Sequence, residues 1–194
     1  MVPPGPATQS SPAPPASAGR AAVVNIVGAG LAGSLLALLL ALRGLQVRVF
    51  ERRSDPRLAA AERGRSINLA LAARGIRALE ATGQGVMQTL WPLMIAMRGR
   101  MVHELDGRQS LVPYGQRPHE VIHSVSRGAL NLELLRAADA FANVELRFGQ
   151  ACRGVDLAAG ELLLRDGVSG EDYALPLAPT IAADGAGSVV RHAL

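Results

Sequence analysis

The hydrophobic pattern near the start of the chain predicts a strand, a glycine turn, a helix and a second strand. Residues 23–27 (VVNIV) are a short, mostly β-branched run, as expected of a buried parallel strand. After three glycines, the Leu- and Ala-rich residues 34–42 predict a helix that Gly44 ends. Residues 46–50 (QVRVF) predict a second strand, which leads into Glu51. The pattern favours one β-α-β unit inside an α/β core.

The same region permits a second interpretation. Residues 21–42 contain no charged side chain, and their length matches the roughly 20 apolar residues of a membrane-spanning helix. The glycines and the short β-branched run interrupt such a helix, so the buried strand, turn and helix are favoured over a membrane span.

After residue 53, the pattern no longer repeats the alternation of strand and helix, and it predicts a β-hairpin. Residues 54–66 are an Arg-rich connection, and residues 67–71 lead into a helix over 72–81 that Gly83 closes. Strands over 101–105 and 110–114 flank Asp106-Gly107, a strong hairpin signal.

The pattern in the last third of the chain, from Ser126 onward, predicts further strands and a helix of the α/β core. Ser126 is placed to cap a helix over 127–141, which Asn143 ends before a strand over 144–148. A second hairpin is expected over 153–165, and a last strand over 180–183. Antiparallel β-structure is therefore inserted into a nucleotide-binding type of α/β unit.

Composition excludes several classes of protein. Hydrophobic residues make up 49% of the 194, so the chain is globular in character, and aromatic residues make up only 3%, which disfavours base-stacking nucleic-acid modules. The net charge of +4 comes entirely from arginine on the basic side, and these arginines form no single stripe, so no nucleic-acid partner is expected. Cys152 has no partner for a disulfide, which favours a reducing, cytoplasmic location.

Residues 1–20 consist largely of Pro, Ala and Ser and cannot bury enough apolar surface to fold. They predict a disordered leader without the basic start of a secretory signal.

The three glycines give the first strand–helix junction a specific chemistry. Gly28, Gly30 and Gly33 form the pattern G-x-G-x-x-G, and Glu51 follows 18 positions after the last of them. In a dinucleotide site the first glycine permits the tight turn, the second the approach of a pyrophosphate, and the third close helix packing. The helix N-terminus attracts the phosphates, and Glu51 accepts from a ribose 2′-hydroxyl. The acid favours FAD or NAD, although Arg52 or Arg53 could accept a 2′-phosphate.

Later segments resemble a known family. The segment ADGAGSVVR (183–191) resembles the Asp-Gly segment of flavin-dependent aromatic hydroxylases, the para-hydroxybenzoate hydroxylase group. Four segments, in this order, are similar to the kynurenine 3-monooxygenase family: GRSINLALAARG (64–75), MRGRMVH (97–103), PYG (113–115) and HSVSRGALN (123–131). The resemblance runs from about residue 23 to residue 194.

That resemblance implies a reaction. FAD is bound, NADPH reduces it, and one oxygen atom of O₂ is transferred to the 3-position of the ring of L-kynurenine, a step of tryptophan degradation. The cofactor carries the chemistry, so no protein nucleophile is required.

The resemblance also implies roles for individual residues. Arg127 matches an arginine that meets the FAD phosphates, and Asp184, followed by Gly185, matches the acid at the FAD ribitol. Other cofactor contacts, several through backbone atoms, fall at Ala32, Phe50, Glu51, Arg52, Arg53, Ala70 and Cys152. For Cys152 an inert buried thiol is favoured over a redox role. The histidines show no ligand spacing, so no metal site is expected.

Arg100 and Tyr114 match the residues that bind the substrate carboxylate in the family. A guanidinium can donate two charge-assisted hydrogen bonds to a carboxylate, and a phenol can add a third. A two-residue turn at Asp106-Gly107 would set Arg100 opposite Pro113, and a three-residue turn that includes Arg108 would set it opposite Tyr114. Arg98 is expected on the same face as Arg100.

The expected fold class is α/β. A Rossmann-like FAD-binding domain is expected over about 21–90 and 120–194, and inserted hairpins over about 95–118 are expected to form part of a substrate domain. The family continues for about as long again, so a truncated chain that by itself binds FAD weakly and hydroxylates poorly is expected. Two alternatives stay open: an NAD-linked Rossmann reductase, and a non-catalytic FAD-binding or interaction protein, anchored through residues 21–42.

Overall fold

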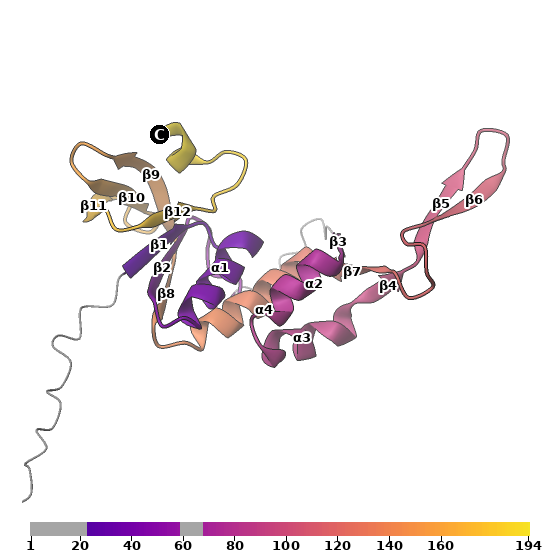
Figure 1. Ribbon diagram of the computed structural model, residues 1–194. Coiled ribbons are helices and arrows are strands. Elements are labelled where there is room, and N and C mark those ends of the chain that lie inside the picture. The colour runs from indigo at the N-terminus through magenta and orange to yellow at the C-terminus, as the bar shows by residue number, and fades with distance from the viewer. Residues whose placement is uncertain (1–22, 59–67) are drawn as a thin grey trace, which may run out of the picture.

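The computed structural model describes residues 23–58 and 68–194 (Figure 1). The predicted leader over residues 1–20 and the first residues of the GRSINLALAARG segment lie outside the described residues.

A four-stranded parallel sheet forms the centre of the fold. Its order is β12 (Thr180–Ala182), β1 (Val23–Val27), β2 (Gln46–Glu51) and β8 (Val144–Phe148). All three pairings are parallel. The sequence predicted each of these strands, and the Rossmann-like expectation is confirmed.

Two helices cover one face of this sheet, as Figure 1 shows. They are α1 (Leu31–Ala41) and α4 (Arg127–Asp139), which pack against each other and share one apolar core with inward-facing strand residues such as Ile26 and Val49. Helix α4 begins at the predicted position, where Ser126 Oγ accepts a hydrogen bond from Ala129 N at 3.4 Å. Helix α1 begins three residues earlier than predicted, because Gly30 already serves as its N-cap and Gly33 lies within its first turn.

The other face of the parallel sheet meets a second, antiparallel sheet of order β11-β10-β9. Strands β9 (Gln150–Asp156) and β10 (Glu161–Asp166) form the predicted second hairpin, and β11 (Asp172–Pro176) adds a strand that was not predicted. Phe50 of β2 and Leu162 and Leu164 of β10 form the apolar contact between these two sheets. The short helix α5 (Val189–His192) packs at the same contact through Val190.

A third sheet joins segments for which the sequence predicted no sheet. Strand β7 (Ile122–Ser126) lies between β3 (Asn68–Leu71) and β4 (Ile95–Met97), and both pairings are antiparallel. The helices α2 (Ala73–Glu80) and α3 (Gln84–Leu90) and the 3-10 turn η1 (Trp91–Leu93) connect β3 to β4. Helix α3 packs against α4, so this part continues the core described above.

The predicted first hairpin is present as β5 (Gly99–His103) and β6 (Gln109–Pro113), and it extends away from the rest of the molecule (Figure 1). Both predicted registers are wrong, since Arg100 lies opposite Val112. The loop starts one residue earlier than expected: Glu104 N donates to Arg108 O at 2.9 Å, and Gly107, at φ +86°, closes a loop over residues 105–107.

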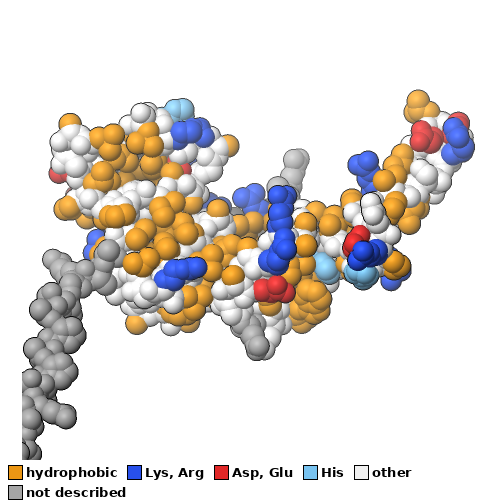
Figure 2. All heavy atoms as spheres, viewed as in Figure 1, with side chains coloured by type: hydrophobic (Ala, Val, Ile, Leu, Met, Phe, Trp, Pro, Cys, Tyr) orange, Lys and Arg blue, Asp and Glu red, His pale blue; other side chains and the backbone are white. Residues whose placement is uncertain are grey.

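The view in Figure 2 shows arginine side chains scattered over the visible face among apolar ones. On this face they form no continuous basic stripe of the kind that tracks a nucleic-acid backbone.

Candidate functional site

The turn between β1 and α1 is closed by contacts with both neighbouring strands. Gly28 N donates to Phe50 O of β2 at 2.8 Å, and Ala183 N, just after β12, donates to Val27 O at 2.8 Å. Gly28 has φ +102°, and a Cβ atom added there would lie 2.5 Å from Ala183 O. Only glycine fits this position, because both the dihedral angle and the space exclude a side chain.

The other two glycines of the motif differ in their surroundings. A Cβ atom at Gly33 would lie 1.9 Å from Gly28 O, so α1 approaches the turn as closely as backbone permits. A Cβ atom at Gly30 would meet nothing within 4 Å. Gly33 therefore serves helix packing, whereas the absence of a side chain at Gly30 leaves space on the ligand side of the turn.

The N-terminus of α1 offers backbone donors beside that space. Its N-cap, Gly30, provides no side-chain hydrogen bond, and the first turn carries no acidic residue. The first N–H groups of a helix have no intrahelical acceptor and lie at the positive end of its dipole. Ala32 is exposed in this first turn. The arrangement suits a phosphate or pyrophosphate.

Glu51 lies at the turn, as the motif predicts. Its Oε2 accepts from Ala29 N at 2.8 Å, and its Oε1 accepts from Arg53 Nε at 2.8 Å. Burial alone would raise the pKa of this carboxyl group, but the hydrogen bonds from Arg53 and Ala29 outweigh it and the pKa is lowered. Glu51 is thus an anionic acceptor at the edge of the site. The charge of Arg53 is directed at Glu51, while Arg52 is exposed.

We expect Glu51→Gln to reduce stability in a pH-dependent way. The folded-state pKa of Glu51 is lowered, so its contribution is fully present above the pKa of the unfolded chain and is lost as the pH falls through the folded pKa. The variant should lose about 1–2 kcal/mol at neutral pH, because hydrogen bonds to a charged group are replaced by neutral ones. Urea unfolding at neutral pH and in acid measures the difference in free energy of unfolding between the wild type and the variant. This difference should become smaller in acid, and a difference independent of pH would contradict the proposed contribution of Glu51.

Asp184 lies where β12 meets the next loop. Its Oδ2 accepts from Val189 N at 2.8 Å, and Gly185, at φ +83°, turns the chain after it. Burial alone would raise its pKa, but hydrogen bonds from Ser188 and from the N–H groups of Val189 and Val190 lower it. Its other oxygen, Oδ1, is buried and has no hydrogen-bond partner in the described part of the chain. An unsatisfied buried carboxylate oxygen indicates a position for a donor such as a ligand hydroxyl.

Cys152, on β9, is half-buried, and its Sγ donates to Gly154 O at 3.6 Å. Burial, and to a lesser degree the negative charge of Asp184, raise the pKa of the thiol. The thiol form is therefore favoured over the nucleophilic thiolate.

Helix α4 approaches the glycine turn through a residue that sequence reasoning did not single out. Asn131 Nδ2 donates to Ala29 O at 3.2 Å, and Ser34 Oγ donates to the same oxygen at 3.0 Å. Arg127 lies one helical turn before Asn131 and is exposed, so it projects from the same side of α4. Asn131 lies in the segment HSVSRGALN (123–131), but a single Asn within a helix gave no reason to assign it a role.

Two other predicted cofactor contacts can be placed. The Phe50 side chain is buried in the core between the sheets, so only its backbone can face a ligand. Ala70 is exposed on β3.

The predicted substrate residues lie on the projecting hairpin. Tyr114 N donates to Arg98 O at 3.0 Å, which continues the β5–β6 register, so Arg98 is the residue opposite Tyr114. Arg98, Arg100, Val112 and Tyr114 therefore share one face, with Arg100 diagonal to Tyr114. Both predicted residues are exposed. The expectation that Arg98 and Arg100 share a face agrees with this register.

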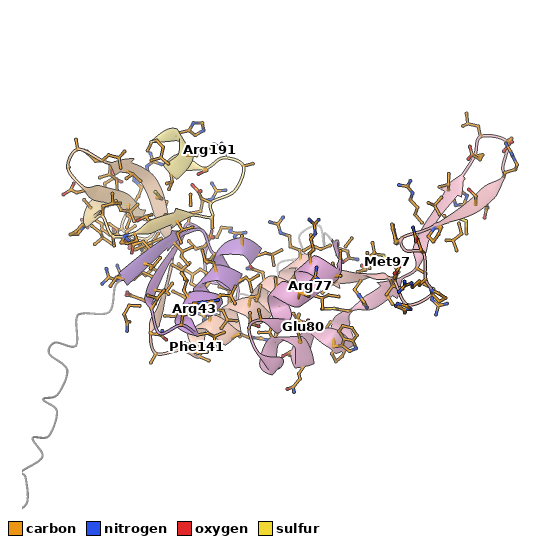
Figure 3. All side chains as sticks on the ribbon, in the orientation of Figure 1. Arg43, Arg77, Glu80, Met97, Phe141 and Arg191 are labelled. Atoms are coloured by element: carbon orange, nitrogen blue, oxygen red, sulfur yellow. The ribbon has the colours of Figure 1, made fainter. Side chains whose placement is uncertain are left out.

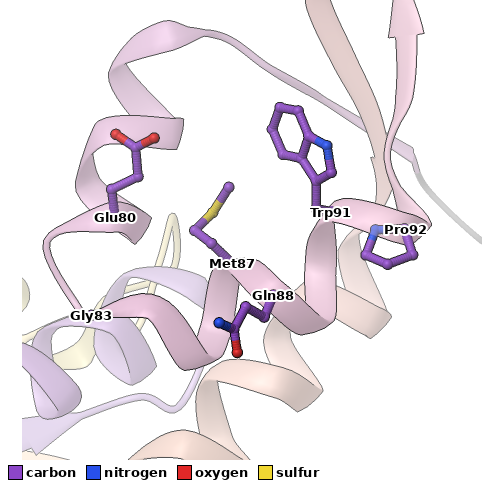
Figure 4. Close-up of a pocket in the computed structure, with 6 residues that line it drawn as sticks. All are labelled: Glu80, Gly83, Met87, Gln88, Trp91 and Pro92. Atoms are coloured by element: carbon purple, nitrogen blue, oxygen red, sulfur yellow. The ribbon is translucent and has the colours of Figure 1, made fainter.

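A separate cavity of about 560 Å³ lies beside α2 and α3. Figure 4 shows its lining, which comprises Glu80, Gly83, Met87, Gln88, Trp91 and Pro92. None of the predicted ligand-binding residues lines it.

Within residues 23–58 and 68–194, no cluster of His, Cys, Asp or Glu side chains suits a metal ion. In the same residues no helix has the length and apolar character needed to cross a membrane. The apolar stretch that permitted a membrane interpretation is, over its described part, a strand, a turn and an eleven-residue helix.

Comparisons with known proteins show the family of the chain. A family model described as "FAD binding domain" matches residues 20–194. The chain is 44% identical over 171 residues to kynurenine 3-monooxygenase of Xanthomonas axonopodis pv. citri, covering 88% of this chain and 37% of that protein. It is 41% identical over 178 residues to kynurenine 3-monooxygenase of Myxococcus xanthus, covering 92% and 38%.

The fold is similar to that of solved oxygenases. The tetrameric form of 2-methyl-3-hydroxypyridine-5-carboxylic acid oxygenase superposes with a TM-score of 0.70 at 22% identity, covering 90% of this chain and 42% of that one. The chain thus spans less than half of the length of each of these three proteins.

Proposed function

The chain belongs to the FAD binding domain family, and from this premise we propose that it is the FAD-binding part of a kynurenine 3-monooxygenase. The observation that carries the proposal is the glycine turn, where the space beside Gly30 meets the donors of the α1 N-terminus and the anionic Glu51. The identity of 41–44% to kynurenine 3-monooxygenases supports the choice of reaction.

When bound, FAD would accept a hydride from NADPH and supply the chemistry that inserts one atom of O₂ into an aromatic ring. The residues of this chain would hold it. The N–H groups at the start of α1 would donate to the pyrophosphate, and Arg127 would add positive charge from the start of α4. Glu51 would accept from the adenosine ribose, and Asp184 Oδ1 would accept from a hydroxyl of the ribityl chain, which would satisfy its free oxygen.

The hairpin face would bind the amino-acid part of L-kynurenine. Arg100 and Tyr114 lie on one face of the β5–β6 hairpin, where a guanidinium and a phenol can donate to one carboxylate. Arg98 is opposite Tyr114 on this face, so we propose that it contributes positive charge to the same carboxylate.

The purified chain is expected to bind FAD. Titration of FAD with the protein should change flavin fluorescence until the change saturates, because binding replaces the adenine and water around the flavin ring with protein groups. NAD under the same conditions should bind at least about tenfold more weakly, a difference of about 1.4 kcal/mol. Preferential binding of NAD, with NAD-linked hydride transfer and no flavin, would instead support a reductase.

The substrate assignment has its own test. The protein isolated at its natural length and reconstituted with FAD should oxidise NADPH faster when L-kynurenine is added, and should release the 3-hydroxylated product. Arg100→Gln should raise KM for L-kynurenine, whereas Arg117→Gln, a change on the loop after β6, should not. Absence of stimulation in a protein that holds FAD would exclude L-kynurenine and leave the cofactor assignment intact.

A further inference from the structure

Hydrogen bonds hold two successive peptides of the glycine turn at Ala29. In the peptide that links Gly28 to Ala29, Ala29 N donates to Glu51 Oε2 at 2.8 Å. In the peptide that links Ala29 to Gly30, Ala29 O accepts from Ser34 Oγ at 3.0 Å and from Asn131 Nδ2 at 3.2 Å. Asn131 lies 102 positions away in the sequence, so this contact is a tertiary one. Ser34 is fully buried, and Ala29 is 2% exposed.

This arrangement has a consequence for the next N–H group. A trans peptide is planar, so its C=O and N–H bonds point in opposite directions. Since Ala29 O is directed toward Asn131 on α4, the N–H of Gly30 in the same peptide is directed away from α4. Gly30 is the position where an added Cβ atom meets nothing within 4 Å. The contact at Ala29 O therefore fixes the direction of the Gly30 N–H, which points away from α4 at a residue with open space beside it.

We propose that Asn131 is a positioning residue for the nucleotide: it fixes the orientation of the 29–30 peptide so that Gly30 N–H donates to the pyrophosphate. The proposal rests on the FAD-binding function proposed above. Ser34 shares the task, but its single hydroxyl hydrogen is divided between Ala29 O and Asn131 Oδ1, 3.4 Å away. Asn131 supplies a donor of its own, and it couples the start of α4 to the glycine turn.

The chain contains a matched control at the opposite end of α1. Asn143, which follows α4, donates through Nδ2 to Ala41 O at 3.0 Å and to Leu45 O at 2.7 Å. Figure 3 labels Arg43 and Phe141 in this region, far from the glycine turn. The two asparagines thus make the same type of contact, from α4 or the residues after it to the backbone of α1 and its flanking loops, and only Asn131 touches the nucleotide site.

Asn131→Ala is expected to weaken FAD binding about tenfold, because an incompletely held peptide no longer presents Gly30 N–H to the phosphate. Both Asn131→Ala and Asn143→Ala should lower the melting temperature of the free chain, and by similar amounts. Asn143→Ala, however, should change the Kd for FAD less than about twofold. FAD fluorescence titration and thermal melting of each variant provide these values. Equal Kd values for the Asn131→Ala and Asn143→Ala variants would overturn the proposal.

Asn131→Asp keeps the shape of the side chain and separates positioning from packing. An ionised carboxylate faces the Ala29 carbonyl as a second acceptor and repels it, whereas a protonated one donates as Asn does. FAD affinity of this variant should be low at neutral pH and should recover several-fold near about pH 5, where a partly buried Asp begins to protonate. An affinity that does not change with pH relative to the wild type would contradict the proposed donor role.

The wild-type protein, measured over the same pH range, is the control for the titration of other groups. Glu51, which accepts from Ala29 N in the preceding peptide, is paired with Arg53, and its pKa is lowered, so it stays ionised. Helices α1 and α3 carry no titratable side chain over their ranges. On β8, Glu145 pairs with Arg147, and on β7, His123 lies against Trp91, with ring centroids 5.2 Å apart.

A last measurement separates this proposal from the proposed function. The Gly30 amide resonance of the ligand-free chain should shift in Asn131→Ala but not in Asn143→Ala, whether or not FAD binds. A wild-type chain that binds no FAD would refute the FAD site, while an unmoved Gly30 resonance would refute the positioning role of Asn131.

Discussion

Gly30→Ala should weaken FAD binding by on the order of a hundredfold, about 3 kcal/mol, while the protein stays folded. The backbone of Gly30, at φ −73° and ψ −176°, is one that alanine adopts without strain, and its Cβ atom would meet no protein atom within 4 Å. Alanine is a poorer N-cap than glycine, so a stability loss below about 1 kcal/mol is expected. The added methyl group would instead occupy the space through which a pyrophosphate approaches the helix N-terminus.

The measurement is a pair of values for one variant: the Kd for FAD and the melting temperature of the free chain. Gly85→Ala is a suitable control, because a Cβ atom there also meets nothing within 4 Å and the residue lies on α3, away from the turn. Gly85→Ala should bind FAD as the wild type does. Retention of wild-type affinity by Gly30→Ala would place the pyrophosphate elsewhere.

Gly33→Ala should have the opposite profile, with a large loss of stability. Its Cβ atom would lie 1.9 Å from Gly28 O and 3.3 Å from the Cβ of Ala183, and neither contact can be relieved by a flexible side chain. Helix α1 would have to move away from the turn, at an expected loss of about 3 kcal/mol, typical of severe overpacking. For a chain of this size that corresponds to a fall of about 6–12 °C in Tm.

Thermal unfolding followed by circular dichroism checks this expectation. FAD affinity should fall as well, since the turn is displaced, so the discriminating quantity is the Tm of the free chain. A Gly33→Ala variant that melts within about 2 °C of the wild type would show that the contact between helix and turn is looser than the structure indicates.

The parallel sheet could be predicted because its signals are local. Short β-branched runs, a glycine motif and an acid at a fixed spacing occur in strands whose partners follow from the topology of a β-α-β unit. The sheet of β3, β7 and β4 was missed for the opposite reason. Its strands, such as IHSVS over Ile122–Ser126, carry polar side chains without clear alternation, and their pairing depends on contacts across many residues.

The hairpin register shows a further limit of sequence reasoning. Asp106-Gly107 indicated the turn correctly, but the loop begins at the exposed Leu105. A shift of one residue changes which side chain lies opposite Arg100. In the observed register Arg100 lies opposite Val112, and Arg100 and Tyr114 therefore lie on the same face of the hairpin. The local motif predicted the existence of the hairpin, and the hydrogen bonds of the loop decided its register.

Asn131 illustrates what the sequence could not provide about the site. The glycines and Glu51 belong to one continuous motif. Asn131, in contrast, contacts Ala29 from another helix, and no local sequence pattern predicts such a tertiary hydrogen bond. The same is true of Asp184, whose motif was visible but whose unsatisfied Oδ1 depends on the fold around it.

The pairing of β1 with β12 has a consequence for how the molecule acquires its structure. Asn25 lies beside Thr180, so the first described strand finds one of its two neighbours only after some 150 intervening residues have been synthesised. Gly28, packed against Ala183, has the same requirement. Such long-range parallel pairing is slow to form, because the entropy of closing the large loop is lost before the contacts compensate for it. We therefore expect the glycine turn to become ordered late in folding, and a nascent chain that ends before β12 should not retain a nucleotide.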